Sequence, residues 1–176
     1  MQHFSEFPVT SDDLLNWMRN NDLRFELFEH EPLHSVSDSK HVQELIDPSG
    51  QGVHVKNLFL RSAKKAQFLV TLEQDRKIDL KALGSHLGKG KLSFGSPERL
   101  MTALGVKPGA VTPLAMIQGT SQNVAFYLDP KVWSGDIVFM HPLINTRTIS
   151  LEKAIFRRFL ELIEAEVTLL DENLLG

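Results

Sequence analysis

The chain of 176 residues contains no cysteine, so disulfide bonds, thiolate metal sites and cysteine nucleophiles are excluded. It has no apolar run close to the roughly 20 residues that a membrane-spanning helix needs. Its first residues show no basic stretch followed by an apolar core, so we expect no signal peptide. These absences together predict a cytoplasmic protein without a membrane anchor.

Neither sign of charge is in large excess. Nineteen lysines and arginines stand against 22 aspartates and glutamates, for a formal net charge of -3. This balance argues against a protein that coats nucleic acid indiscriminately, but it leaves room for a local basic patch. The composition, 42% hydrophobic and 23% charged, is typical of a globular protein. At this length we expect residues 1–176 to form a single domain.

Several catalytic motifs are absent or incomplete. No Gly-x-Ser-x-Gly elbow occurs, and the glycine- and lysine-rich stretch 84–91 lacks the spacing of a Walker-type phosphate loop. The segment His30-Glu31-Pro32-Leu33-His34 matches the HExxH zinc pattern, which requires both histidines on one helix. Pro32 prevents a helix there. We therefore predict neither a metal site nor a cofactor.

The hydrophobic pattern predicts an α+β fold, with a mixed, mainly antiparallel and partly barrel-like sheet flanked by helices. Strands are expected at 24–28, 53–60, 67–72, 91–94, 124–128, 137–140 and 146–149. Helices are expected at 10–20, 39–46, 80–87, 97–104 and 151–170, so a short helix begins the fold and a long one closes it. A polar turn between the second and third strands predicts a hairpin.

One predicted strand carries a lysine and an asparagine side by side. Alternation along Val53–Arg61 places Asn57 on one face with valine and phenylalanine, and Lys56 on the other with leucines. A buried charge among aliphatic groups is costly unless it has a partner. The pattern fits either a lysine that snorkels from an edge strand or a binding site.

Two later segments combine polar groups with an irregular backbone. Gly105–Pro113 holds two glycines and two prolines within nine residues, which allows the backbone to approach a ligand closely and offer it N–H groups. A purely structural turn fits the same pattern. His141 ends a predicted strand, and Asn145 follows four residues later. Both are also ordinary turn residues.

Four segments occur in the order and spacing of a known family. They are VKNLFLR at 55–61, KLSFGSPERL at 91–100, GVKPGAVTPL at 105–114 and FMHPLINT at 139–146. Over residues 24–165 the chain resembles the YbaK/prolyl-tRNA synthetase-associated domain family, and within it the free-standing editing proteins of the ProX or PrdX type. The resemblance implies that family's fold and a trans-editing aminoacyl-tRNA deacylase, which maintains translation fidelity by hydrolysing the ester bond of mischarged tRNA-Pro.

The resemblance also implies roles for individual residues. The positions that match the family's catalytic residues are Lys56, Asn57, Gly109 and His141. The positions that match its substrate-binding residues are Ala110, Val111, Thr112, Pro113, Asn145 and Ser37, the last replacing a threonine common in relatives. We expect Lys56 to hold the terminal adenosine as a positioning cation and Asn57 to orient the ester. The Gly109–Pro113 loop would hold the aminoacyl group and the attacking water, in a pocket that His141 and Asn145 shape.

The expected substrate is Ala-tRNA-Pro. A synthetase for proline cannot exclude smaller amino acids by shape, because a missing methylene is worth only about 1–3 kcal/mol, and a second, smaller site restores accuracy. Three alternatives are a Cys-tRNA-Pro deacylase of the YbaK type, a non-catalytic module that binds tRNA or a synthetase, and a sensor of free amino acids. The expected partner is the aminoacyl end of tRNA-Pro, with prolyl-tRNA synthetase as a further candidate. Candidates for contact with the tRNA backbone are Lys64, Lys65, Lys89 and Lys91.

Overall fold

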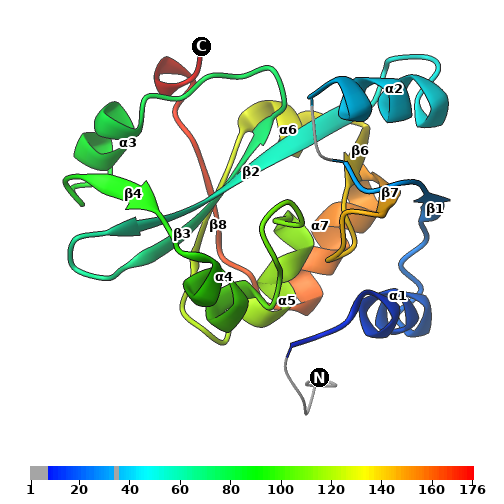
Figure 1. Cartoon of the computed structure of the whole chain (residues 1–176), viewed down its shortest axis with the longest axis horizontal. Coiled ribbons are helices and arrows are strands. Elements are labelled where there is room, and N and C mark those ends of the chain that lie inside the picture. Colours follow the sequence, from blue (N-terminus) through cyan, green and yellow to red (C-terminus); the bar gives the residue numbers. More distant parts are fainter. Residues whose placement is uncertain (1–7, 34–35) are drawn as a thin grey trace.

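The computed structural model describes residues 8–33 and 36–176, and within that range the side chains of 36–38 are not described (Figure 1). The α-helices are α1 (Ser11–Asn20), α2 (Val36–Ile46), α3 (Leu80–His86), α4 (Pro97–Leu104), α5 (Met116–Gly119), α6 (Pro130–Ser134) and α7 (Lys153–Leu162). Two 3₁₀ helices are η1 (Pro113–Ala115) and η2 (Glu172–Leu174). The strands are β1 (Glu26–Glu29), β2 (Val53–Ser62), β3 (Gln67–Glu73), β4 (Leu92–Phe94), β5 (Ala125–Leu128), β6 (Ile137–Met140), β7 (Arg147–Glu152) and β8 (Val167–Leu169).

The eight strands of the described residues belong to one mixed sheet. Its order is β1-β7-β6-β2-β3-β5-β8, and β4 pairs with β2 beside this path. The pairs β1–β7, β2–β3, β2–β4 and β6–β7 are antiparallel, whereas β2–β6, β3–β5 and β5–β8 are parallel. The expected α+β class, with helices against a mixed sheet, is confirmed, and so is the β2–β3 hairpin.

The two faces of the sheet are packed differently. Along β2, Val55 and Phe59 belong to the main hydrophobic core, while Leu58 and Leu60 belong to a second, smaller cluster on the opposite face. This is the alternation expected for the strand. In Figure 1, helices α1, α4, α5 and α7 lie below β2, α3 lies above it, and α2 lies beside the end where β2 begins. We call the first side the core face and the second the cavity face.

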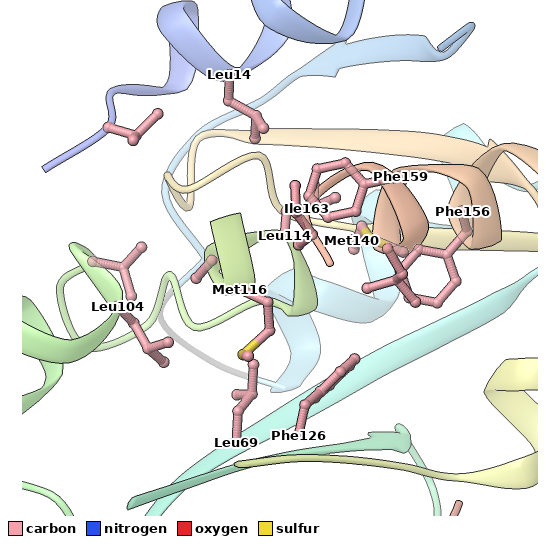
Figure 2. Packing of buried hydrophobic residues seen from close by; sticks show 14 of the residues in the cluster. Leu14, Leu69, Leu104, Leu114, Met116, Phe126, Met140, Phe156, Phe159 and Ile163 are labelled. Carbon is pink, nitrogen blue, oxygen red and sulfur yellow. The ribbon is translucent and has the colours of Figure 1, made fainter. Parts of the chain in front are cut away.

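The main core fills the space between the core face and its helices. Figure 2 shows Leu69 of β3 pointing toward Met116 of α5, and Phe126 of β5 pointing to the side of the sheet where Phe156 and Phe159 of α7 lie. All five are at most 2% exposed. Side chains of this size, removed from water together, supply most of the free energy that fixes the sheet against these helices.

The three capped helix starts read from the sequence are confirmed, whereas the helix expected from residue 39 begins at Val36. Thr10 caps α1 with a reciprocal capping box to Asp13, and Asp79 caps α3. Ser96 caps α4, with Pro97 in its first turn, and Gly105 ends it in the left-handed region at φ 68°. No helix within the described part of the chain is long and apolar enough to cross a membrane.

The predicted long C-terminal helix is wrong in its second half. Helix α7 ends at Leu162, and residues 167–169 form β8, which pairs in parallel with β5. The helix end is a Schellman motif, in which Ala165 donates to the carbonyl of Leu160 and Glu164 donates to that of Glu161. The left-handed residue of this motif is Glu164, at φ 54°, where glycine is usual. The stop signal is therefore invisible in the sequence.

Candidate active site

The candidate site lies where strands β2 and β6 separate, a place in the sheet that we call the fork. Strands β2 and β6 are paired over only two positions, Val53 with Val138 and His54 with Phe139. Farther along the same edge, β2 pairs with β4 from Leu60 onward. Where β2 and β6 part, a cavity of about 270 Å³ opens beneath α2. Its lining residues are Leu33, Ser39, Lys40, Val42, Gln43, Ile46, His54, Val55, Lys56, Asn57, Gln74, Asp75, Phe139, Met140, His141 and Thr148.

Lys56 is held at the wall of this cavity. Its ammonium group donates a hydrogen bond to the carbonyl of Arg76, in the turn after β3. That turn is itself anchored, because Arg76 lies 2.9 Å from Glu172 and 3.5 Å from the fully buried carboxylate of Asp129. An ammonium group has three donors, so a single carbonyl leaves it able to bind an anion as well.

Asn57 points through the sheet to the opposite side. Its amide nitrogen donates to the carbonyl of Val111 at 2.9 Å, and its amide oxygen accepts from the hydroxyl of Thr71 at 2.6 Å. The carbonyl of Phe59, two residues along, accepts from Gly95 on the edge away from β3. Backbone groups two residues apart face the same edge of a strand. The backbone N–H and C=O of Asn57 therefore face the fork.

The glycine-proline loop contains a type II turn. Ala110 donates to the carbonyl of Lys107 at 3.0 Å, Pro108 takes the second position, and Gly109 takes the third at φ 88°. Only glycine adopts that backbone angle readily. The buried Thr112 then caps η1 by accepting from Leu114.

The loop lies next to the fork but does not line its cavity. Asn57 joins the two through its hydrogen bond to the carbonyl of Val111. A Cβ atom at Gly109 would lie 3.6 Å from the amide nitrogen of Asn145, so these two predicted site residues are neighbours. Gly109, the residues from Ala110 to Pro113 and Asn145 are outside the set of described residues that border the cavity, unlike Lys56, Asn57 and His141.

His141 lies across the fork from Lys56, at the end of β6. Its Nδ1 is 2.8 Å from the carbonyl of Arg147. A carbonyl can only accept, so Nδ1 carries a proton and Nε2 is the acceptor of the neutral ring. Burial lowers the pKa of His141, a backbone hydrogen bond opposes this, and the nearby His30 lowers it further. The ring is therefore neutral at pH 7.

Sequence reasoning missed an aspartate–histidine pair, of which His54 borders the same cavity and Asp47 lies behind it. His54 precedes Lys56 by two residues on the same face of β2, and its Nε2 lies 3.3 Å from Oδ2 of Asp47. Its ring stacks on Phe139, with centroids 4.5 Å apart and planes 10° from parallel. The sequence could have indicated that His54 lies on the same face as Lys56, because residues two apart on a strand share a face. It could not have indicated the contact with Asp47, because that contact depends on how the turn after α2 returns to the sheet.

Two other features named from the sequence involve residues outside the description. Ser37 lies in α2, but its side chain is not described, and His34 of the HExxH segment also lies outside the described residues. His30 is described: its Nε2 lies 2.9 Å from the hydroxyl of Thr148. Across residues 8–33 and 36–176, no group of three or more histidine, aspartate or glutamate side chains is placed to hold a metal ion.

The family model of the aminoacyl-tRNA editing domain matches residues 30–159 of the chain, which include the fork and the loop. Among curated proteins, the chain is 36% identical over 130 residues to the prolyl-tRNA editing protein ProX of Acetoanaerobium sticklandii, covering 73% of this chain and 77% of that one. It is 32% identical over 152 residues to the prolyl-tRNA synthetase associated domain-containing protein 1 of Danio rerio, covering 85% and 80%.

Solved structures show the same fold. A crystal structure described as a candidate trans-editing enzyme for prolyl-tRNA synthetase superposes with a TM-score of 0.67 over 95% of this chain and 99% of that one, at 18% identity. The crystal structure of the hypothetical protein APE2540 gives a TM-score of 0.65 over 88% and 95%, at 16% identity. At such identities the likeness concerns the fold alone.

Proposed function

The chain belongs to the aminoacyl-tRNA editing domain family, and from that premise we propose that it is a trans-editing deacylase that hydrolyses mischarged tRNA-Pro, with Ala-tRNA-Pro as its substrate. The observation that carries this proposal is the placement of the Lys56 ammonium in the wall of a cavity at a fork between two strands. The cavity can hold a small acyl group, and the fixed cation beside it can bind the anionic nucleotide to which that group is attached.

Lys56 binds the phosphate or ribose of the terminal adenosine in this proposal. Its hydrogen bond to Arg76 fixes where the ammonium group lies, and its two remaining donors are available to the nucleotide. The anchoring of Arg76 by Asp129 and Glu172 makes this position rigid before substrate arrives. Preorganised charge of this kind stabilises a transition state without reorganising during the reaction.

Asn57 orients the ester. Its backbone N–H faces the fork, where it can donate to the oxygen of the ester carbonyl as negative charge develops there. Its side chain holds the carbonyl of Val111, which sets how closely the Gly109–Pro113 loop approaches the cavity. The loop does not line the cavity, so it acts on the site by holding the side chain of Asn57. His141 offers Nε2 as an acceptor for the ammonium group of the amino acid.

No covalent enzyme intermediate is needed, because an aminoacyl ester is already activated. Water attacks the carbonyl carbon, the bond to the ribose oxygen breaks, and the amino acid leaves with the tRNA restored. Discrimination against proline is steric in this proposal: the pocket admits alanine and rejects the larger ring, which is the logic of a second sieve.

The test is a deacylation assay with tRNA-Pro charged separately with alanine, cysteine and proline. We expect rapid loss of the alanyl ester and survival of the prolyl ester. Faster loss of the cysteinyl ester would reassign the substrate while keeping the reaction. Loss of the prolyl ester at the same rate as the alanyl ester, or no loss of any ester, would contradict the proposal.

A further inference from the structure

Asp47 and His54 form a preorganised unit beside Lys56. Asp47 follows α2, and its Oδ2 accepts from the backbone of Gly52 at 2.9 Å as well as meeting His54. Its Oδ1 accepts from the hydroxyl of Ser49 at 3.0 Å. The side chains of Asp47 and His54 are only 7% and 12% exposed. The carboxylate is thus held from three directions, and it in turn fixes the plane of the imidazole.

This arrangement sets the tautomer of His54. With Nε2 donating to the carboxylate, the lone pair of the neutral ring is on Nδ1. Within the described residues Nδ1 has no hydrogen-bond partner, and the ring borders the cavity. His54 and Lys56 are two residues apart on one face of β2, so their Cα atoms are separated by roughly 7 Å. His54 and the cation that positions the substrate therefore lie on the same face of β2 and border the same cavity.

His54 is better suited than His141 to take up a proton. A proton that arrives on His54 creates an imidazolium beside the carboxylate of Asp47, which stabilises it. A proton that arrives on His141 has no such partner, because that ring faces a neutral carbonyl and a second histidine, His30, with ring centroids 6.1 Å apart. The surroundings of His54 thus stabilise a protonated ring, and those of His141 do not.

We propose that His54, oriented by Asp47, is the general base that activates the attacking water in the deacylation proposed above. Nδ1 accepts a proton from the water as its oxygen bonds to the ester carbonyl carbon. When the bond between that carbon and the ribose oxygen breaks, the imidazolium returns the proton to the ribose oxygen. The products are the free amino acid and the tRNA hydroxyl, and His54 is neutral again.

Burial and nearby charged groups together set the pKa of His54. His54 borders a second, neighbouring cavity as well, and the titratable residues that line the two cavities beside it are Lys40, Glu44, Asp47, Lys56, Glu73, Asp75, Lys131 and His141. Burial lowers the pKa of His54, while the hydrogen bond and charge of Asp47 and the charge of Glu73 oppose this, and the net direction is downward. The base is therefore unprotonated at pH 7, and activity should be lost as the pH falls through a pKa below 6.5.

His54→Phe tests the proposal, because phenylalanine preserves the stack on Phe139 and removes both ring nitrogens. We expect kcat for Ala-tRNA-Pro to fall by about 10²–10³-fold with little change in KM, as for the loss of a general base. Asp47→Asn, which can still accept from Gly52, should lower kcat at least tenfold. His86→Gln, at an exposed position on α3, is the matched control and should match the wild type.

Two readouts separate catalysis from a structural role. The acid limb of the pH–rate profile should vanish in His54→Phe, and added imidazole should restore activity to His54→Ala in proportion to its concentration. Nitrogen NMR should show His54 of the wild type protonated on Nε2 alone at pH 7. A His54→Phe variant within twofold of the wild type, or with the same acid limb, would overturn the proposal and leave the deacylase function standing. Absence of deacylation by the wild type itself would overturn both.

Discussion

Neighbouring residues of β2 point to opposite faces of the sheet, and the two faces have different roles. On the core face, Phe59 is 4% exposed and packs with the main cluster. On the cavity face, His54 and Lys56 stay half-buried and are bonded to polar groups from other elements. Their partners lie in the turns after α2 and β3. One strand therefore carries the fold on one side and the candidate chemistry on the other.

The difference shows how the site is kept open without destabilising the sheet. The core face is filled by apolar side chains from helices that include α1, α4, α5 and α7, whereas α2 leaves space over the cavity face where β2 and β6 part. Asn57 is the exception, since it lies on the core side and uses its amide to hold the glycine-proline loop. Substitutions on the two faces should accordingly separate stability from activity.

The largest effect on stability is expected on the core side. Phe159→Ala removes a ring that is fully buried and meets Trp17 edge to face, with centroids 6.0 Å apart. The free energy of unfolding should fall by about 3–5 kcal/mol, measured by urea denaturation. Deacylation per folded molecule, measured well below the melting temperature, should be unchanged. A loss of less than 1 kcal/mol would mean that this packing does not hold the sheet against α7.

The largest effect on activity is expected on the cavity side. Lys56→Ala should lower kcat/KM for Ala-tRNA-Pro by about 10²–10³-fold, because it removes the fixed cation. Its melting temperature should stay near that of the wild type, because Lys56 is half-buried and bonded to a backbone carbonyl. Lys153→Ala, which removes a half-exposed lysine paired with Asp136, is the matched control. Near-normal turnover by Lys56→Ala would remove the lysine from the mechanism.

Asn57→Ala should affect both properties moderately, because this residue joins the two sides. The substitution leaves the Val111 carbonyl and the buried Thr71 hydroxyl without their partner, which costs about 1–3 kcal/mol. We expect roughly a tenfold fall in kcat as the loop loses its contact with the fork. Thermal melts and single-turnover assays measure the two effects. Asn16→Ala, at an exposed position on α1, should show neither.

The smallest effect is expected far from the fork. Thr10→Ala removes the capping box of α1, so the free energy of unfolding should fall by about 1 kcal/mol with no change in deacylation. Thr10→Ser keeps a capping hydroxyl and should behave like the wild type. A change in kcat in Thr10→Ala would show that α1 is coupled to the site.

Local signals in the sequence were sufficient for most of the fold. Caps such as Thr10 and Ser96 and the alternation along β2 act over a few residues, and the structure follows them. The end of α7 was missed because its left-handed residue is Glu164 instead of glycine, and so β8 was missed with it. The short helices α5 and α6 were also missed, because four or five residues are too few to establish a helical period.

The candidate site was predictable only in its residues, and not in its layout. The resemblance supplied Lys56, Asn57 and His141, all of which line the cavity. The pairing of β2 with β6, which brings positions 54 and 139 together, is a contact between distant segments and leaves no local trace in the sequence. Asp47 joins His54 by the same kind of tertiary contact. A single sequence without such contacts cannot reveal that pair.

The most direct test of where the substrate binds is an NMR titration with 3′-alanylamino-3′-deoxyadenosine, whose amide replaces the labile ester. We predict that backbone amide shifts change at 54–57 on β2, at 139–141 on β6 and at 39–46 on α2, and that Lys56→Ala abolishes these changes. Shifts confined to the outer surfaces of α1 and α7, with none at the fork, would contradict the account.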